Sequence, residues 1–183
     1  MVIMLHFYLR ISMRTLLIAL ITVTSLLAIG ENTNTMQADF TQTITNDRNS
    51  TITYRGDMLA KRPSLALWHY VDPIEKSVYI TPRSATIVEP ELEQAIIKKL
   101  DNSIDILAIL ASAKKVSKDH YNAIYDDKEY LIEMKSGYIH SITYSDAFEN
   151  IVQITFSKQK INKKISDTKF EAIIPLDYDI IKD

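Results

Sequence analysis

Much of the chain alternates apolar and polar residues with the two-residue period of β-strands. Residues 38–44 read Ala-Asp-Phe-Thr-Gln-Thr-Ile, and a similar alternation returns at residues 51–54 after a cluster of Asn and Asp. Successive side chains of a strand point to opposite faces of a sheet, so this alternation is typical of half-buried strands. The sequence therefore predicts a β-hairpin whose second strand continues to about Ala60.

Further strands are expected along most of the remaining chain. The pattern predicts them at residues 65–70, 76–81, 85–88, 120–125, 129–134, 138–144, 150–156 and 170–174. Short turn clusters separate most of these runs, and no internal repeat or linker divides them. Consecutive strands joined by short turns indicate one antiparallel meander.

One segment has the periodicity of a helix instead. Its apolar residues recur at three- and four-residue spacing: Ile104, Leu107, Ala108 and Ala111. Asn102 or Ser103 is placed to cap its first turn. Other apolar residues in the segment make the helix apolar on more than one side. We therefore expect the helix to be covered on one face and to lie over an apolar space on the other.

The N-terminus has the order of a secretory signal peptide. Arg14 precedes an apolar run at residues 16–27, and small residues follow at Ala28 and Gly30. The run is shorter than the roughly 20 residues of a membrane-spanning helix, although an uncleaved anchor is the alternative. We expect a signal peptide at residues 1–30, cleaved after Gly30 or, as a second choice, after Ala28.

The N-terminal segment also bears on the translation start and on the domain organisation. Met13 is a second candidate start, because Met-Arg-Thr directly precedes the apolar run. Residues 31–183 are then one exported domain, a size that suits a single hydrophobic core.

Composition narrows the chemistry further. The chain has 183 residues, of which 46% are hydrophobic and 24% charged, so it is an ordinary globular sequence. The absence of cysteine excludes disulfides, thiol catalysis and cysteine metal sites. A net charge of −2 weighs against nucleic-acid binding, which favours a basic surface. No nucleophile or metal motif is present, so we expect no enzyme, cofactor or metal.

The most specific stretch lies at residues 55–75. Lys61-Arg62-Pro63 interrupts strand-like sequence and is followed by Trp68, the only tryptophan, and by Tyr70. Together with the opening Phe40-Thr41-Gln42, these residues resemble the outer-membrane lipoprotein carrier family, the LolA-like periplasmic lipoprotein chaperones. The resemblance covers about residues 37–181.

This resemblance implies a fold and a role. The fold is mainly β with helices (α+β), a curved antiparallel half-barrel whose open, apolar mouth is covered by helices. The role is to accept acylated lipoproteins from an inner-membrane Lol-type ABC transporter, shield their acyl chains and deliver them to the outer membrane. The family implies a monomer, and whether an outer-membrane receptor takes part is left open.

Site residues follow from the same resemblance. Arg62 is expected to be a latch that binds the lid while the cavity is empty, the alternative being a surface ion pair. Candidate residues that line the acyl cavity are Phe40, Leu59, Trp68, Tyr70, Ile104, Leu107 and Phe156, with ordinary core packing as the alternative. Trp68 and Tyr70 share one strand face.

Two other functions stay open at this point. A periplasmic carrier of related fold could transport a different lipid or glycolipid. A lipid hydrolase could use His69, although a solvated strand histidine explains that residue more simply.

Overall fold

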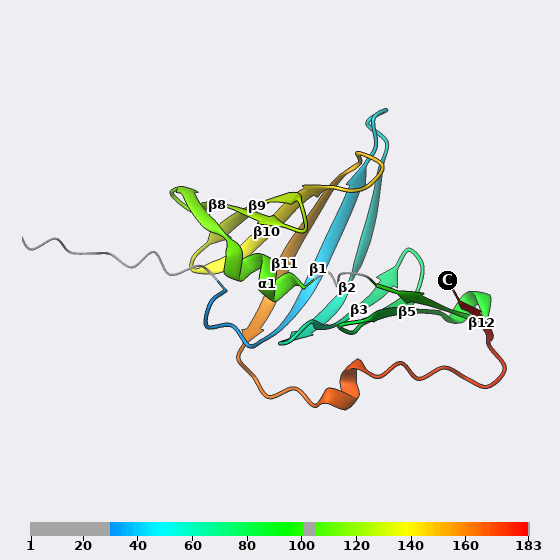
Figure 1. Cartoon of the computed structure of the whole chain (residues 1–183). Coiled ribbons are helices and arrows are strands. Elements are labelled where there is room, and N and C mark those ends of the chain that lie inside the picture. Colours follow the sequence, from blue (N-terminus) through cyan, green and yellow to red (C-terminus); the bar gives the residue numbers. More distant parts are fainter. Residues whose placement is uncertain (1–29, 101–104, 183) are drawn as a thin grey trace, which may run out of the picture.

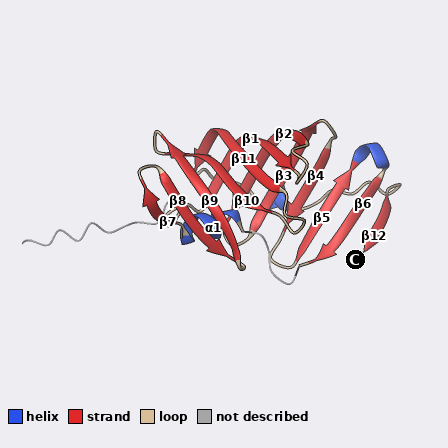
Figure 2. Cartoon of the chain, turned by 90° about the horizontal axis from the view of Figure 1, so that it is seen from above, coloured by secondary structure: helices blue, strands red, loops and turns tan. Residues whose placement is uncertain are grey.

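The computed structural model describes residues 30–100 and 105–182, which form one twelve-stranded sheet and a single α-helix. Figure 1 shows the sheet curving around the helix, and Figure 2 shows the strands side by side across it. The predicted mainly β, curved and open sheet is confirmed. The described ranges leave out the predicted signal peptide before Gly30, the start at Met13, the caps Asn102 and Ser103, and the cavity residue Ile104.

The twelve strands follow most of the predicted alternation. They are β1 (Thr35–Thr45), β2 (Thr51–Lys61), β3 (Leu65–Asp72), β4 (Lys76–Ile80), β5 (Ser84–Glu89), β6 (Gln94–Lys99), β7 (Lys114–Ser117), β8 (His120–Tyr125), β9 (Lys128–Lys135), β10 (Tyr138–Ser145), β11 (Ile151–Ile161) and β12 (Asp179–Lys182). The sequence pattern does not predict β6, β7 or β12. β6 has an unbroken apolar run after Gln94, and β7 and β12 are four-residue strands exposed throughout, so none of them alternates.

The strand order corrects the predicted simple meander. The order across the sheet is β12-β6-β5-β4-β3-β2-β1-β11-β10-β9-β8-β7. β1 pairs with β2 on one side and with β11, more than a hundred residues later, on the other. β12 pairs with β6 in parallel, whereas all other pairings are antiparallel. The first strand thus joins two antiparallel meanders in the middle of the sheet.

The predicted strand at residues 170–174 is wrong. Asp167–Phe170 forms a short 3₁₀ helix (η2), and the chain then continues without a paired strand until β12. Phe170 is only 3% exposed, so it packs against the sheet rather than standing in a hydrogen-bonded ladder. The apolar alternation here reflects packing of a covering segment, which has the same two-residue period.

The α-helix, α1 (Ile106–Ser112), begins later than predicted. Its N-cap is Asp105, whose Oδ1 accepts hydrogen bonds from the backbone N–H groups of Leu107 and Ala108. A side-chain oxygen at this position satisfies donors that the first turn leaves unpaired. A second short 3₁₀ helix, η1 (Pro90–Leu92), lies between β5 and β6. Among the described residues one α-helix, rather than the several expected, covers the sheet.

The sheet has two distinct faces. The inner face, toward α1, carries the main core, whose fully buried side chains include Met36, Met58, Leu107 and Leu110. The outer face is crossed by the segment after β11, drawn orange to red in Figure 1, which contains η2 and Phe170. No helix among the described residues is long and apolar enough to span a membrane.

Candidate functional site

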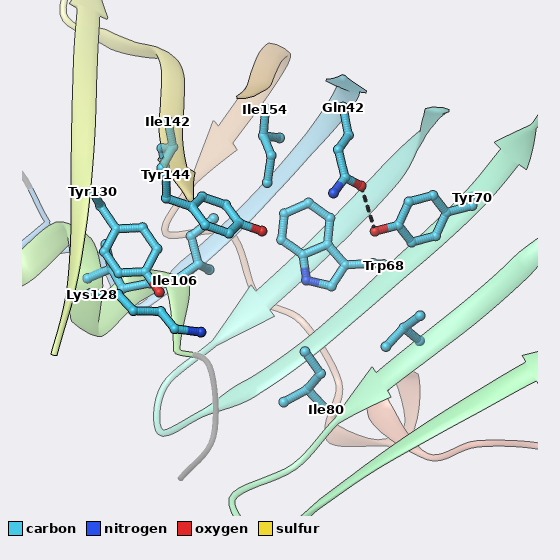
Figure 3. A pocket seen from close by; sticks show the side chains of 12 residues that line it. Gln42, Trp68, Tyr70, Ile80, Ile106, Lys128, Tyr130, Ile142, Tyr144 and Ile154 are labelled. Carbon is cyan, nitrogen blue, oxygen red and sulfur yellow. Dashed lines mark hydrogen bonds between the residues drawn. The ribbon is translucent and has the colours of Figure 1, made fainter. Parts of the chain in front are cut away.

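An apolar pocket lies between α1 and the inner face of the sheet. Its volume is about 180 Å³, and it is lined by side chains from β1, β3, β4, α1, β9, β10 and β11. Figure 3 shows Trp68, Tyr130 and Tyr144 around this space, with Ile80 at its lower edge. The pocket is thus built from residues far apart in the sequence that the curvature of the sheet brings together.

Aromatic rings form one wall of the pocket. Trp68 and Tyr70 line it, as their shared strand face predicts. Phe40 lies behind them and contacts both rings edge-on, at centroid distances of 5.0 and 5.1 Å. Phe156 is buried beside Trp68, at 6.4 Å. Edge-to-face aromatic contacts favour a defined ring arrangement, so Phe40 and Phe156 support this wall without lining the pocket.

Two predicted lining residues occupy other places. Leu59 lies on the outer face, because Met58 pairs with Trp68 on the inner face and neighbouring residues of a strand point oppositely. Leu107 is fully buried in the core, while Ile106 and Ile109 of the same helix line the pocket. Leu59 and Leu107 are therefore not among the residues that line this pocket, and a role in an opened cavity stays a prediction.

Polar groups that the sequence analysis did not single out also line the pocket. Tyr70 donates its hydroxyl hydrogen to Oε1 of Gln42 at 2.9 Å. Burial raises the pKa of Tyr70 well above its ordinary value and the pKa of Tyr144 to about 12, so both hydroxyls remain protonated donors even in alkaline solution near pH 10. Lys128 begins β9 and also lines the pocket, although its position beside Asp127 suggests a turn. The sequence alone could not show that these side chains face the pocket, because this depends on the register of the strands.

Arg62 lies in the tight turn between β2 and β3, next to α1. Its Nε donates to the carbonyl oxygen of Thr33 at 2.8 Å, and its Nη2 donates to those of Gly30 at 3.2 Å and Leu107 at 2.8 Å. A guanidinium suits this role because its donors form a rigid planar fork. Arg62 forms no ion pair with any of the described residues, and this argues against the alternative of a surface ion pair.

The same turn holds the start of α1 through a second contact. Oδ2 of Asp105 accepts hydrogen bonds from the backbone N–H of Ser64 at 3.1 Å and from its hydroxyl at 3.0 Å. Asp105 is 8% exposed and uses its other oxygen as the helix cap. An Asp directly before an apolar helical run is a recognisable cap signal in the sequence, but its contact with Ser64 is not.

The far end of α1 meets the N-terminal segment. The backbone N–H of Gly30 donates to the carbonyl oxygen of Leu110 at 3.3 Å. A Cβ at position 30 would lie 2.6 Å from the Cβ of Leu110, so the close approach requires glycine. Hydrogen bonds near both ends therefore hold α1 in place.

The hydrolase interpretation finds little support in the geometry. Nδ1 of His69 lies 3.0 Å from Oδ2 of Asp57, and Nε2 lies 3.9 Å from Oε1 of Glu75, all on the outer face and away from the pocket. Ser77 lies opposite His69 on β4 and on the same face, but within the described residues no hydrogen bond joins its hydroxyl to the imidazole. Within residues 30–100 and 105–182, no cluster of three or more His, Asp or Glu side chains could hold a metal ion.

Comparisons with known proteins agree with this architecture. The model of the family described as outer membrane lipoprotein carrier protein LolA matches residues 31–172, well over half of the chain. This chain belongs to the LolA family. A Campylobacter jejuni member named outer-membrane lipoprotein carrier protein is 39% identical over 169 residues, covering 92% of this chain and 99% of that protein. A Wolinella succinogenes member of the same name is 34% identical, covering 85% and 91%.

A solved structure resembles this LolA family member in fold. An uncharacterized conserved protein from Thermus thermophilus superposes with a TM-score of 0.52 at 10% sequence identity, covering 85% of this chain and 94% of that one. Likeness at this identity concerns the fold alone.

Proposed function

We propose that this chain is a periplasmic chaperone that accepts acylated lipoproteins from an inner-membrane Lol-type ABC transporter and delivers them to the outer membrane. Membership of a carrier family supports this role, as do the names of its Campylobacter and Wolinella relatives. The observation that carries the proposal is the apolar pocket between α1 and the inner face. Acyl chains of the cargo would occupy this space, with no catalysis, cofactor or metal.

The size of the pocket supports a closed, empty carrier. Its volume of about 180 Å³ is below the roughly 300–1,000 Å³ of pockets that enclose drug-sized ligands. Long acyl chains would therefore enter only if α1 moved away from the sheet. Such a movement breaks the bond from Arg62 to Leu107 and the bonds between Ser64 and Asp105.

The energies explain why a carrier benefits from this arrangement. Burying one CH₂ group releases about 0.8 kcal/mol, so a chain of roughly sixteen carbons releases about 13 kcal/mol and would be hard to hand on. Hydrogen bonds to a charged group contribute about 1.5–3 kcal/mol each. The bond from Arg62 to Leu107 and the two bonds between Ser64 and Asp105 thus oppose loading by several kcal/mol without preventing it. Closure of α1 can then assist release.

The test uses Arg62→Leu in the periplasm of the native host. We expect the variant to accept cargo but to release it poorly, so that more lipoprotein co-purifies with it than with the wild type. Arg62→Lys is the matched control, because one ammonium keeps the charge but cannot bond three carbonyl groups in a planar fork. It should accumulate cargo to an intermediate degree.

Mass spectrometry of the co-purified material identifies the cargo class, and thermal melting reports on folding. Lipids without attached protein would replace the lipoprotein role with that of a general lipid carrier. If Arg62→Leu melts far below the wild type, or carries no extra cargo, Arg62 is structural and the latch is excluded.

The contacts of Gly30 also bear on signal-peptide cleavage. Cleavage after Gly30 would remove a carbonyl group that Arg62 binds and the N–H that bonds Leu110. Cleavage after Ala28 would keep both, so we propose this second choice for the mature N-terminus. N-terminal sequencing of the periplasmic protein decides between the two sites, and an intact residue 16–27 segment would contradict export by cleavage.

A further inference from the structure

Three hydrogen-bonding side chains of the pocket under α1 gather toward one end, and two more, Lys128 and Tyr130, line it from β9. Gln42, Tyr70 and Tyr144 lie on the sheet wall toward the β1–β2 turn, whereas Ile80 lies toward the β2–β3 turn. The strand register gives the distance between the two ends of the pocket. Tyr70 pairs with Lys76 of β4, and Lys76 lies four residues, or about 13 Å, from Ile80 along this strand. An elongated ligand would therefore meet polar groups at one end and apolar groups at the other.

The polar end holds donors whose hydrogens are free. The bond from Tyr70 occupies Oε1 of Gln42 and turns the amide so that its NH₂ group faces the pocket (Figure 3). In the described part of the chain, neither Nε2 of Gln42 nor the hydroxyl of Tyr144 has a hydrogen-bond partner. Ile154 of β11 pairs with Gln42 of β1 and with Ile142 of β10, which lies two residues before Tyr144. The side chains of Gln42 and Tyr144 therefore both lie on the inner face.

Such donors are unfavourable in a pocket meant for hydrocarbon alone. A polar group that loses water without gaining a partner destabilises the complex, whereas a ligand acceptor restores the hydrogen bond. A carbonyl oxygen attached to a long apolar chain supplies this acceptor. A fatty-acyl ester or amide has this arrangement, with one polar end and one methyl end.

We propose that Gln42, positioned by Tyr70, and Tyr144 donate hydrogen bonds to the carbonyl oxygen of a fatty-acyl ester or amide. The acyl chain then lies with its carbonyl group between β1, β3 and β10 and its methyl end beneath α1, toward Ile80. This inference rests on the proposed carriage of acyl chains and adds a polar contact that orients them. It makes the carrier selective for acyl linkages over plain hydrocarbon.

The test compares two lipids of equal length, a long-chain acyl methyl ester and the alkyl methyl ether that lacks the carbonyl oxygen. Their affinities for the mature protein are measured by displacement of a fluorescent acyl probe. We expect the wild type to prefer the ester by about three- to tenfold, as one or two neutral hydrogen bonds allow. Gln42→Leu should lose this preference and keep its affinity for the ether.

Two further variants separate the roles. Tyr70→Phe leaves the amide of Gln42 free to rotate, so the preference should fall partway while binding of the ether is kept. Gln153→Leu makes the same substitution on the outer face, at the residue next to the inner-facing Val152, and should change neither affinity. The ratio of the two affinities is the decisive measurement, because a general loss of folding lowers both alike.

Every outcome of this test either supports or overturns the inference. A wild type that binds ester and ether equally, or a Gln42→Leu variant that keeps the preference, overturns this inference alone. A protein that binds neither lipid overturns the proposed function as well. A free fatty acid that binds more tightly than the ester, with the same advantage in Gln42→Leu, would assign the polar end to a carboxylate bound by Lys128 and would also overturn the inference.

Discussion

Lys61 and Arg62 are neighbours in the chain, but they hold covering segments on opposite faces of the sheet. Nζ of Lys61 donates to the carbonyl oxygen of Ile165 at 3.0 Å and pairs with Oδ1 of Asp167 at 2.6 Å, on the outer face. Arg62 bonds only to carbonyl oxygens, including one on α1, on the inner side. One turn of the β2–β3 hairpin therefore contacts both covers.

The two covers differ in what else stabilises them. The outer segment is anchored by the buried ring of Phe170 and ends in β12, which joins the sheet beside β6. α1 buries four apolar side chains but lies over a pocket, and hydrogen bonds from the turn hold its first residues. Exposing buried side chains is costly on either face, but acyl chains that enter the pocket would replace the packing of α1 against the sheet. In the proposed function, α1 is therefore the cover that moves and the outer segment stays in place.

The largest effect is expected on the outer cover. Phe170→Ala removes a buried ring and should lower the free energy of unfolding by about 3 kcal/mol. Amide hydrogen exchange in β12 should rise, because its segment loses its anchor. Acyl-probe binding should stay near wild type, since Phe170 lies on the opposite face from the pocket. Leu176→Ala, at a fully exposed position of the same segment, is the control and should change stability little. Loss of probe binding in Phe170→Ala would contradict the separation of the two covers.

A smaller loss of stability is expected on the inner cover, with a gain in binding. Asp105→Ala removes the helix cap and the two bonds to Ser64, so the free energy of unfolding should fall by about 1–2 kcal/mol. The acyl probe should bind more tightly, because α1 is easier to displace. Asp105→Asn keeps a capping oxygen but replaces Oδ2, which accepts the bonds from Ser64, by an NH₂ donor, so it should lie between wild type and Asp105→Ala in both measurements. Weaker probe binding in Asp105→Ala would show that α1 is part of a rigid wall.

Alkaline pH should lower the free energy of unfolding through the buried tyrosine side chain on the inner face. Burial raises the pKa of Tyr144 from 10.0 to about 12. An unfolded chain releases this proton near pH 10 while the folded protein retains it, so stability is present below pH 10 and decreases as the pH rises toward 12. Denaturant unfolding at pH 8 and pH 11 measures the decrease, and Tyr144→Phe should show less of it. An identical decrease in the variant would mean that Tyr144 does not contribute.

The smallest effect belongs to the ion pair on the outer face. Lys61→Met removes the pair with Asp167, whose side chain is 72% exposed, so the free energy of unfolding should fall by less than about 1 kcal/mol. The difference from wild type should shrink at high salt, because salt screens exposed charges. Lys61→Arg retains the charge and serves as the control. A large loss that salt does not affect would mean that Lys61 anchors the outer cover as strongly as Phe170.

The local pattern of apolar and polar residues was sufficient to predict most strands of the sheet. The alternation around Phe40 and Trp68 predicted strands and the shared face of Trp68 and Tyr70, since side-chain direction along one strand depends only on its two-residue period. Four-residue strands such as β7 and β12 were missed because their short, exposed sequences show no apolar alternation. The prediction at residues 170–174 was wrong because a packed, unpaired segment has the same alternation as a strand.

The sequence by itself determined the mainly β class, the Lys-Arg-Pro turn at residues 61–63 and the aromatic strand after it, because these depend on neighbouring residues. Only the tertiary structure decided the faces and partners of individual side chains. Pairing of Met58 with Trp68 placed Leu59 on the outer face, and pairing of β1 with β11 brought Gln42 near Tyr144. The contacts of Arg62 with Gly30 and Leu107 likewise join segments 32 and 45 residues away. Such contacts depend on strand register and sheet curvature, which the whole core sets at once and no local pattern contains.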